Sequence, residues 1–270
     1  MKYKILVLDL DGTLTNTQKE ITPYTRETLI RAQEQGLKIV LASGRPTYGI
    51  VPLAEELRLG DFEGYILSYN GGQIIDWKTR ELMYENVLDP QVYPYLYECA
   101  HSNGFVILSY KDEDIVSEDA GNPYVQHEAF LNKMSSITVP SFLDVIDFPV
   151  AKCLIVGDPD PLAELEIKMK KDLDGKMNVF RSEPFFLELV PNGIDKARSL
   201  AVLLNELNMK PEDMIAVGDG FNDLSMIKFA GLGVAMANAQ EVVKEEADYI
   251  TLSNEEDGVA AVVNKFFFNR

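Results

Sequence analysis

The chain has 270 residues, of which 46% are hydrophobic and 25% are charged, and 43 acidic residues against 25 basic ones give a formal net charge of −18. This composition excludes a disordered protein, and the acidity disfavours nucleic acid and anionic membranes as partners. No apolar run approaches the roughly 18 residues that a membrane span requires, so we expect a protein of the cytoplasm.

The sequence holds only two cysteines, Cys99 and Cys153, which lie in separate segments. They form no C-x-x-C motif and no histidines cluster in the chain, which disfavours a disulfide framework and a structural zinc site. We expect two free thiols, buried or half-buried. We expect His101 and His127 to be surface or packing residues.

The N-terminal segment has the pattern of a βαβ unit. Residues 2–10 form a nearly continuous apolar run, as expected of a central parallel strand that is covered on both faces. A helix-like stretch opens at Thr22 and Pro23 and closes near Gly36, and residues 37–43 repeat the apolar run. A third strand is expected over 64–69.

A turn at residues 70–72 then predicts an antiparallel pair around 77–80. Alternating strands and helices return near the C-terminus. The expected order is strand 214–218, helix 222–230, strand 231–236, helix 240–247, strand 249–252 and a final helix. We therefore predict an α/β fold with a doubly wound parallel sheet that is divided between the two ends of the chain.

The middle of the chain has a different pattern. Hairpin-like pairs of strands are expected around 111–113 and around Pro184, mixed with helices. We predict that residues 84–189 form an inserted α+β domain, and that residues 1–83 and 190–270 together form the core domain.

Carboxylates gather where two of the expected core strands end. Asp9 and Asp11 follow the first strand, and Asp219 and Asp223 follow the strand over 214–218. Ligands bind at the carboxyl ends of strands in open α/β sheets, and like charges held close together are costly without a cation. Four carboxylates at one edge favour Mg²⁺, a hard cation that prefers oxygen ligands and often bridges to phosphate.

Two further segments add groups that suit a phosphate. Ser43 and Gly44, in the segment Ser-Gly-Arg, end the second strand, where a hydroxyl and backbone N–H groups can hold a phosphate oxygen. Lys196 opens an expected helix after the insert. Together the segments supply a nucleophile, a metal site, a cation and a proton donor, which are the parts that phosphoryl transfer to a carboxylate needs.

These segments resemble a known family. The strings DLDGTL at 9–14 and ASGR around Ser43, then Lys196 and GDGFND at 218–223, are similar in order to the four motifs of the haloacid dehalogenase superfamily. The long insert resembles that of its Cof-type subfamily, which carries a type IIB cap. One departure is Ala197, where many relatives have glycine.

The resemblance implies a role for each motif residue. Asp9 would be the nucleophile and Asp11 the general acid and base. The implied Mg²⁺ site comprises Asp9, Asp11 through its backbone carbonyl, Asp219, and Asp223 as a supporting residue. The implied phosphate-binding residues are Ser43, Gly44, Lys196 and Asn222. Arg45 and Asn70, at strand ends, are further candidates for contact with substrate.

The activity that we predict is a Mg²⁺-dependent phosphatase acting on a small phosphorylated metabolite through an aspartyl-phosphate. The resemblance implies sugar phosphates as the substrate class. One alternative is a phosphotransferase or mutase, in which a substrate hydroxyl takes the phosphoryl group from Asp9. Another is a receiver-type signalling module, but such modules need no acid corresponding to Asp11 and carry no cap.

Overall fold

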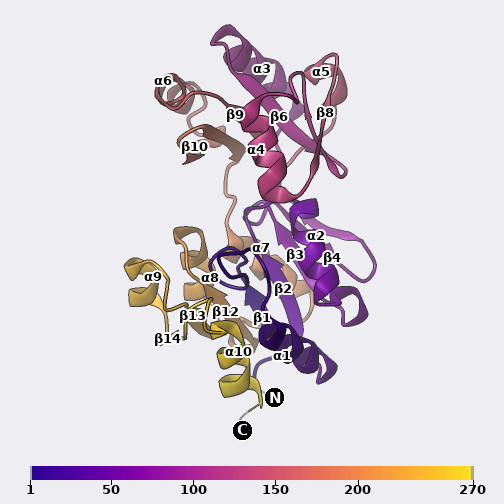
Figure 1. Cartoon of the computed structure of the whole chain (residues 1–270), viewed down its shortest axis with the longest axis vertical. Helices are drawn as coiled ribbons and strands as arrows, with labels where there is room; N and C mark the ends of the chain where they lie inside the picture. The colour runs from indigo at the N-terminus through magenta and orange to yellow at the C-terminus, as the bar shows by residue number, and fades with distance from the viewer. Residues whose placement is uncertain (1, 269–270) are drawn as a thin grey trace. The chain divides into compact units, whose positions relative to one another are not determined.

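The structure, a computed structural model, describes residues 2–268 (Figure 1). The chain forms two compact units. The first comprises Met1–Glu85 and Asp195–Arg270, and the second comprises Asn86–Ile194. The insert expected over 84–189 differs from the second unit at both ends, because the strand Leu82–Glu85 pairs within the sheet of the first unit and the strand Phe186–Pro191 runs beyond 189.

The first unit contains an eight-stranded sheet in the order β14-β13-β12-β1-β2-β3-β4-β5. Neighbours from β14 to β3 are parallel, and β3, β4 and β5 are antiparallel. The predicted doubly wound sheet, divided between the chain ends, is therefore confirmed. The strands are β1 (Ile5–Leu8), β2 (Lys38–Ala42), β3 (Tyr65–Ser68), β4 (Gln73–Asp76), β5 (Leu82–Glu85), β12 (Met214–Gly218), β13 (Leu232–Ala235) and β14 (Tyr249–Ile250).

Helices cover both faces of this sheet (Figure 1). Successive side chains of β1 point to opposite faces. Leu6 and Leu8 therefore pack in one apolar cluster with α1, α2 and α10, whereas Ile5 and Val7 pack in another with α7. The helices are α1 (Pro23–Glu34), α2 (Thr47–Glu56), α7 (Lys196–Glu206), α8 (Leu224–Phe229), α9 (Glu241–Glu246) and α10 (Gly258–Val263).

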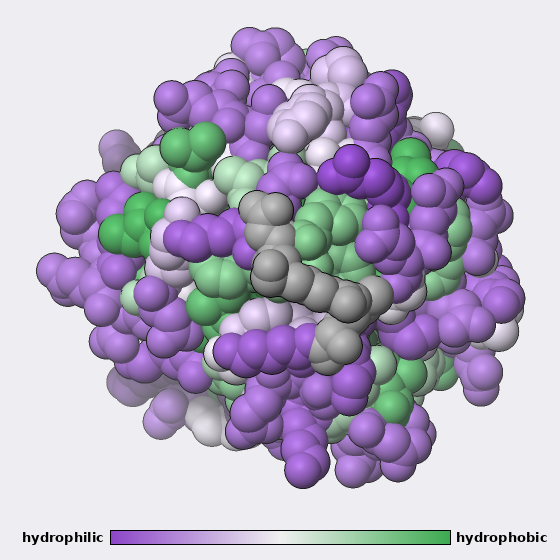
Figure 2. All heavy atoms as spheres, turned by 90° about the horizontal axis from the view of Figure 1, so that it is seen from below, coloured by the Kyte–Doolittle hydropathy of each residue, from purple (hydrophilic) through white to green (hydrophobic). Residues whose placement is uncertain are grey.

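One face of the first unit is mostly hydrophilic. Seen from the end that carries α1 and α10, hydrophilic residues dominate and hydrophobic ones are scattered between them (Figure 2). Within residues 2–268, no helix is both long enough and apolar enough to cross a membrane.

The second unit has a six-stranded sheet in the order β10-β11-β9-β6-β7-β8, with the expected hairpins β6–β7 and β10–β11. Its α+β character is as predicted, its two cysteines are buried free thiols, and both histidines are exposed. Its strands are β6 (Val106–Lys111), β7 (Asp114–Ser117), β8 (Ser135–Thr138), β9 (Cys153–Val156), β10 (Met177–Glu183) and β11 (Phe186–Pro191). Its helices are α3 (Tyr93–Ser102), α4 (Pro123–Asn132), α5 (Phe142–Val145) and α6 (Pro159–Asp172).

The turn between β3 and β4 packs against the start of α7. Gly71 has φ +100°, and a Cβ atom there would lie 2.5 Å from Ser199 Oγ and 2.7 Å from the carbonyl oxygen of Asp195. The absence of a side chain at this position therefore allows the turn to approach the first turn of the helix that begins at Lys196.

We expect Gly71→Ala to lower the free energy of unfolding by about 1–3 kcal/mol, because it adds both a backbone penalty and a steric clash. Gly36→Ala is the matched control: Gly36 has φ +92°, but no atom lies within 4 Å of its Cβ position. Urea unfolding of both variants measures the difference. Equal losses would show that the close approach to α7 contributes nothing.

Candidate active site

The predicted site residues of the first unit gather at the carboxyl ends of its central strands. Asp9 follows β1, and its backbone N–H donates to the carbonyl oxygen of Val217 in β12 at 3.0 Å. Ser43 follows β2 and donates in the same way to Leu67 in β3 at 2.9 Å. The hydrogen bonding of the sheet thus continues one residue past the strand ends and fixes the backbone of Asp9 and Ser43.

A buried lysine joins two of the motifs. Lys196 is 1% exposed and is the first residue of α7. Its Nζ donates to Asp9 Oδ1 at 2.7 Å, to Asp223 Oδ1 at 2.6 Å and to the carbonyl oxygen of Ala42 at 2.9 Å. Burial disfavours its charged form, but the carboxylates of Asp223 and Asp9 outweigh this and raise the pKa of Lys196 above its usual range. All three donors of the ammonium group are therefore used.

The remaining carboxylate oxygens of Asp9, Asp219 and Asp223, here called the carboxylate cluster, differ in what they contact. Asp223 Oδ2 accepts from the backbone N–H groups of Asp219 at 3.0 Å and Gly220 at 2.9 Å. Asp219 Oδ1 accepts from the Thr13 hydroxyl at 2.8 Å. Within residues 2–268, neither Asp9 Oδ2 nor Asp219 Oδ2 has a hydrogen bond to protein, whereas both oxygens of Asp223 do.

Close approach at this cluster requires glycine at position 12. Gly12 has φ +87°, and a Cβ atom there would lie 2.4 Å from Asp219 Oδ2. Glycine adopts this left-handed conformation at little cost and adds no side chain. The glycine in the DLDGTL string is therefore explained by the proximity of the Asp219 carboxylate.

The cluster carries more negative charge than its lysine can neutralise. Asp9, Asp219 and Asp223 each offer a carboxylate oxygen, and these three atoms lie within 4.8 Å of one another. Burial, and then the charge of Asp223, raise the pKa of Asp9 to about 8 despite the nearby Lys196. Burial raises the pKa of Asp219 to about 6 although Thr13 donates a hydrogen bond to it. This donor set of hard oxygens fits Mg²⁺.

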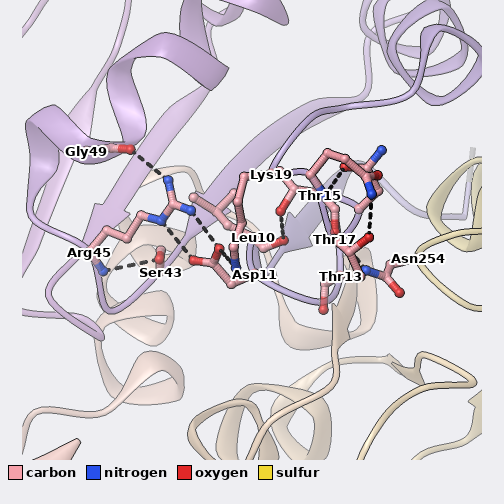
Figure 3. A network of polar contacts seen from close by, with 12 residues as sticks. Leu10, Asp11, Thr13, Thr15, Thr17, Lys19, Ser43, Arg45, Gly49 and Asn254 are labelled. Atoms are coloured by element: carbon pink, nitrogen blue, oxygen red, sulfur yellow. Dashed lines mark hydrogen bonds and ion pairs between the residues drawn. The ribbon is translucent and has the colours of Figure 1, made fainter. Parts of the chain in front are cut away.

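Asp11 lies outside this cluster, between two cations (Figure 3). Arg45 forms a bidentate ion pair with it, from Nε to Oδ2 at 2.8 Å and from Nη2 to Oδ1 at 2.6 Å. Lys19 Nζ donates to Oδ1 at 2.7 Å. Burial would raise the pKa of Asp11, but the hydrogen bonds and charges of Arg45 and Lys19 lower it below its usual value.

The loop that follows Asp11 is tied to the C-terminal part of the first unit (Figure 3). Asn254 Nδ2 donates to the carbonyl oxygen of Thr15 at 2.9 Å, and the backbone N–H of Thr17 donates to Glu255 Oε1 at 2.7 Å. These contacts fix the segment that carries Lys19.

The predicted phosphate-binding residues lie at the same edge. Ser43 Oγ accepts from the backbone N–H of Arg45 at 3.2 Å, and Asn222 Nδ2 donates to Asn70 Oδ1 at 3.0 Å. A Cβ atom on Gly44 would lie 2.9 Å from Asn70 Nδ2, so this position also requires a small residue.

All ten predicted site residues thus belong to the first unit. Sequence reasoning did not single out Thr13 or Lys19 as site residues. Thr13 lies inside the DLDGTL string, which could have drawn attention to it. Lys19 lies eight residues beyond Asp11 in a loop, and no sequence pattern marks it. Arg45, a candidate for contact with substrate, uses two guanidinium nitrogens on Asp11 and a third on the carbonyl oxygen of Gly49.

Comparisons with known proteins point to one family. A family model of haloacid dehalogenase-like hydrolases matches residues 6–263. The crystal structure of a haloacid dehalogenase-like hydrolase from Bacteroides thetaiotaomicron is similar with a TM-score of 0.96 and 64% identity, over 98% of this chain and 100% of that one. The 5-amino-6-(5-phospho-D-ribitylamino)uracil phosphatase YcsE of Bacillus subtilis (strain 168) is 31% identical over 261 residues, which cover 96% of this chain and 94% of YcsE.

A third relative has a solved structure. The HAD subclass IIB sugar phosphatase BT4131 is similar with a TM-score of 0.79 and 25% identity, over 97% of this chain and 98% of that one. The matches therefore include both units and all four motifs. The prediction of a phosphatase from this superfamily agrees with the names of these relatives.

The charge of the carboxylate cluster leads to a prediction for metal binding. Folding raises the pKa of Asp9 from its ordinary value of 3.8 to about 8, so at any pH between these values the carboxyl group takes up a proton when the protein folds. The metal-free protein should therefore lose stability as the pH rises through that window. Mg²⁺ competes with these protons. Millimolar MgCl₂ should therefore raise Tm more at about pH 8.5 than at about pH 5.5.

Differential scanning calorimetry with and without MgCl₂ measures this increment. Asp219→Asn, which removes one carboxylate of the cluster, should abolish most of it at both pH values. An increment independent of pH, or unchanged in Asp219→Asn, would contradict a metal site on these carboxylates.

Proposed function

Because the chain belongs to the haloacid dehalogenase-like hydrolase family, we propose that it is a Mg²⁺-dependent phosphatase of small phosphorylated metabolites, with sugar phosphates as the favoured class. The observation that carries this proposal is the buried group formed by Lys196, Asp9 and Asp223, beside which Asp219 stands. The sugar phosphatase among the similar solved structures supports the substrate class.

In the first half-reaction, Asp9 acts as the nucleophile through Oδ2, the oxygen with no hydrogen bond to the described part of the protein. A bond forms between Oδ2 and phosphorus while the bond from phosphorus to the ester oxygen breaks. Lys196 holds Asp9 by its other oxygen and places a positive charge beside the phosphoryl group. When bound, Mg²⁺ would favour the ionised form of Asp9 and neutralise charge on the phosphoryl oxygens.

Asp11 supplies the proton that the departing ester oxygen takes up. In the second half-reaction a water attacks phosphorus, gives a proton to Asp11 and releases phosphate from Asp9. Arg45 and Lys19 favour the ionised form of Asp11, which is the form that accepts this proton. A dianionic phosphate ester brought beside Asp11 raises its proton affinity, which favours the acid form needed in the first half-reaction.

The other motif residues are proposed to hold the phosphoryl group and the metal. Asp219 would ligate Mg²⁺ through its free Oδ2, together with Asp9 and the backbone carbonyl of Asp11, while Asp223 would orient Lys196 and the loop after β12. The residues proposed for the phosphoryl oxygens are Ser43, Gly44, Lys196 and Asn222, and Asn70 stays a candidate for contact with substrate.

The second unit is proposed to act as the cap that discriminates between substrates. Two features support this role. Its residues contribute none of the four motifs, which all lie in the first unit, and it has the α+β composition expected of a type IIB cap.

We expect Asp9→Asn to reduce kcat to less than about a hundredth of the wild-type value, because an amide cannot replace the carboxylate as nucleophile. Hydrolysis of 4-nitrophenyl phosphate measures the loss. The variant should remain folded by circular dichroism, since the amide is neutral and nearly isosteric with a carboxyl group whose charged form burial disfavours. Activity within tenfold of wild type would rule out a covalent intermediate on Asp9.

Asp11→Asn tests the proton transfer separately. We expect kcat/KM to fall by about 10² or more on an alkyl phosphate, whose leaving oxygen must be protonated, and by less on 4-nitrophenyl phosphate, whose leaving group departs as an anion. The ratio of the two losses is the measurement. Equal losses on the two esters would assign protonation of the leaving group to another residue.

A further inference from the structure

The two oxygens of Asp11 are held unequally. Oδ1 accepts from both Lys19 and Arg45, at 2.7 Å and 2.6 Å, whereas Oδ2 accepts only from Arg45 Nε, at 2.8 Å. A carboxylate oxygen accepts about two hydrogen bonds, so Oδ2 is the atom with room for a further partner. On the mechanism proposed above, the ester oxygen of a substrate would meet Asp11 at Oδ2, while Lys19 contacts the other oxygen of the same carboxylate (Figure 3).

The Lys19 ammonium group has unused hydrogen-bond donors beside Asp11. Its side chain is 51% exposed, and Asp11 is its one hydrogen-bond partner within residues 2–268. An ammonium group has three donors, so two of them have no partner among residues 2–268. Arg45 also keeps two of its five N–H donors, but its side chain is only 13% exposed and its guanidinium is held by Asp11 and Gly49, so Lys19 is the more accessible cation.

The turn that carries Lys19 presents its side chain in a fixed position. Lys19 adopts a left-handed conformation with φ 61°, and its backbone N–H donates to the carbonyl oxygen of Asn16 at 3.0 Å. Asn16 also closes the turn through its side chain, which accepts from the N–H groups of Gln18 and Glu20, each at 3.0 Å. Glycine or asparagine would adopt this backbone more easily than lysine. Lysine therefore does not favour the conformation of this turn. It does place an ammonium group beside Asp11.

We propose that Lys19 adds to the specificity supplied by the cap by binding a hydroxyl oxygen of the leaving group next to the ester oxygen, so that polyhydroxylated leaving groups are preferred to plain alkyl groups. The proposal rests on the phosphatase activity and on Asp11 as the proton donor. A leaving group bound at Asp11 Oδ2 has the hydroxyl groups of its first sugar ring near the Lys19 ammonium, which contacts Oδ1 of the same carboxylate. A neutral hydroxyl suits the place better than a second anion, because it accepts from Lys19 without facing repulsion from Asp11 and from a chain of net charge −18.

Glycerol 3-phosphate and n-propyl phosphate test this directly, because they share a three-carbon chain and differ in the hydroxyl groups. The wild type should prefer glycerol 3-phosphate in kcat/KM by about tenfold or more, the usual gain from a hydrogen bond to a charged group. Lys19→Asn removes the charge and keeps a residue that tolerates the left-handed turn. In this variant the preference should fall to within about threefold, and Lys19→Arg, which keeps a cationic donor, should retain most of it.

Lys4→Asn is the matched control. Lys4 is also 51% exposed and pairs with one carboxylate, Asp213, at 2.9 Å, and its loss should leave the preference unchanged. The proposal is overturned if the wild type shows no preference, if Lys19→Asn keeps it, or if both esters slow equally in Lys19→Asn, which would mean that Lys19 acts only by holding Asp11. A wild type that fails to hydrolyse even 4-nitrophenyl phosphate in MgCl₂ would instead refute the phosphatase activity itself.

Discussion

The contact on which the site depends is the buried ion pairing of Lys196 with Asp9 and Asp223. Removing a lysine and two carboxylates from water is costly, and it is tolerated here because each of the three ammonium donors has an acceptor at 2.6–2.9 Å. The pairing does not balance the charge, since Asp219 adds a third carboxylate. The fold therefore holds an unneutralised negative charge in place, which is the condition that a divalent cation relieves.

This arrangement depends on long-range order in the sheet. Asp9, Ser43, Lys196 and Asp219 lie far apart in sequence, and the parallel register of β12, β1, β2 and β3 brings three of them to one edge. The fourth arrives on α7, which packs on the opposite face from α1 through the cluster around Ile5 and Val7. The two apolar clusters on the faces of the sheet thus bring together polar residues that are distant in sequence.

Much of this follows from the sequence. Apolar runs predicted the parallel strands, and the order of the four motifs predicted the family, which the match over 6–263 confirms. The roles of the motif residues stay predictions. The pairing of Lys19 and Arg45 with Asp11 was not predicted, because hydrophobic periodicity carries no information about where a long side chain in a loop will point. The strand β11 pairs as far as Pro191, beyond residue 189, where the sequence pattern predicts the end of the insert.

The start of α7 has a consequence for how this architecture can vary. The chain returns from the second unit at Asp195, one residue before Lys196. Contacts within the first unit hold that helix start. Asp195 caps it by accepting from the N–H of Arg198 at 2.9 Å, and the turn at Gly71 packs closely against it. These contacts position Lys196 from within the first unit. Inserts of different sequence can therefore join the chain at this point without altering the contacts that position Lys196.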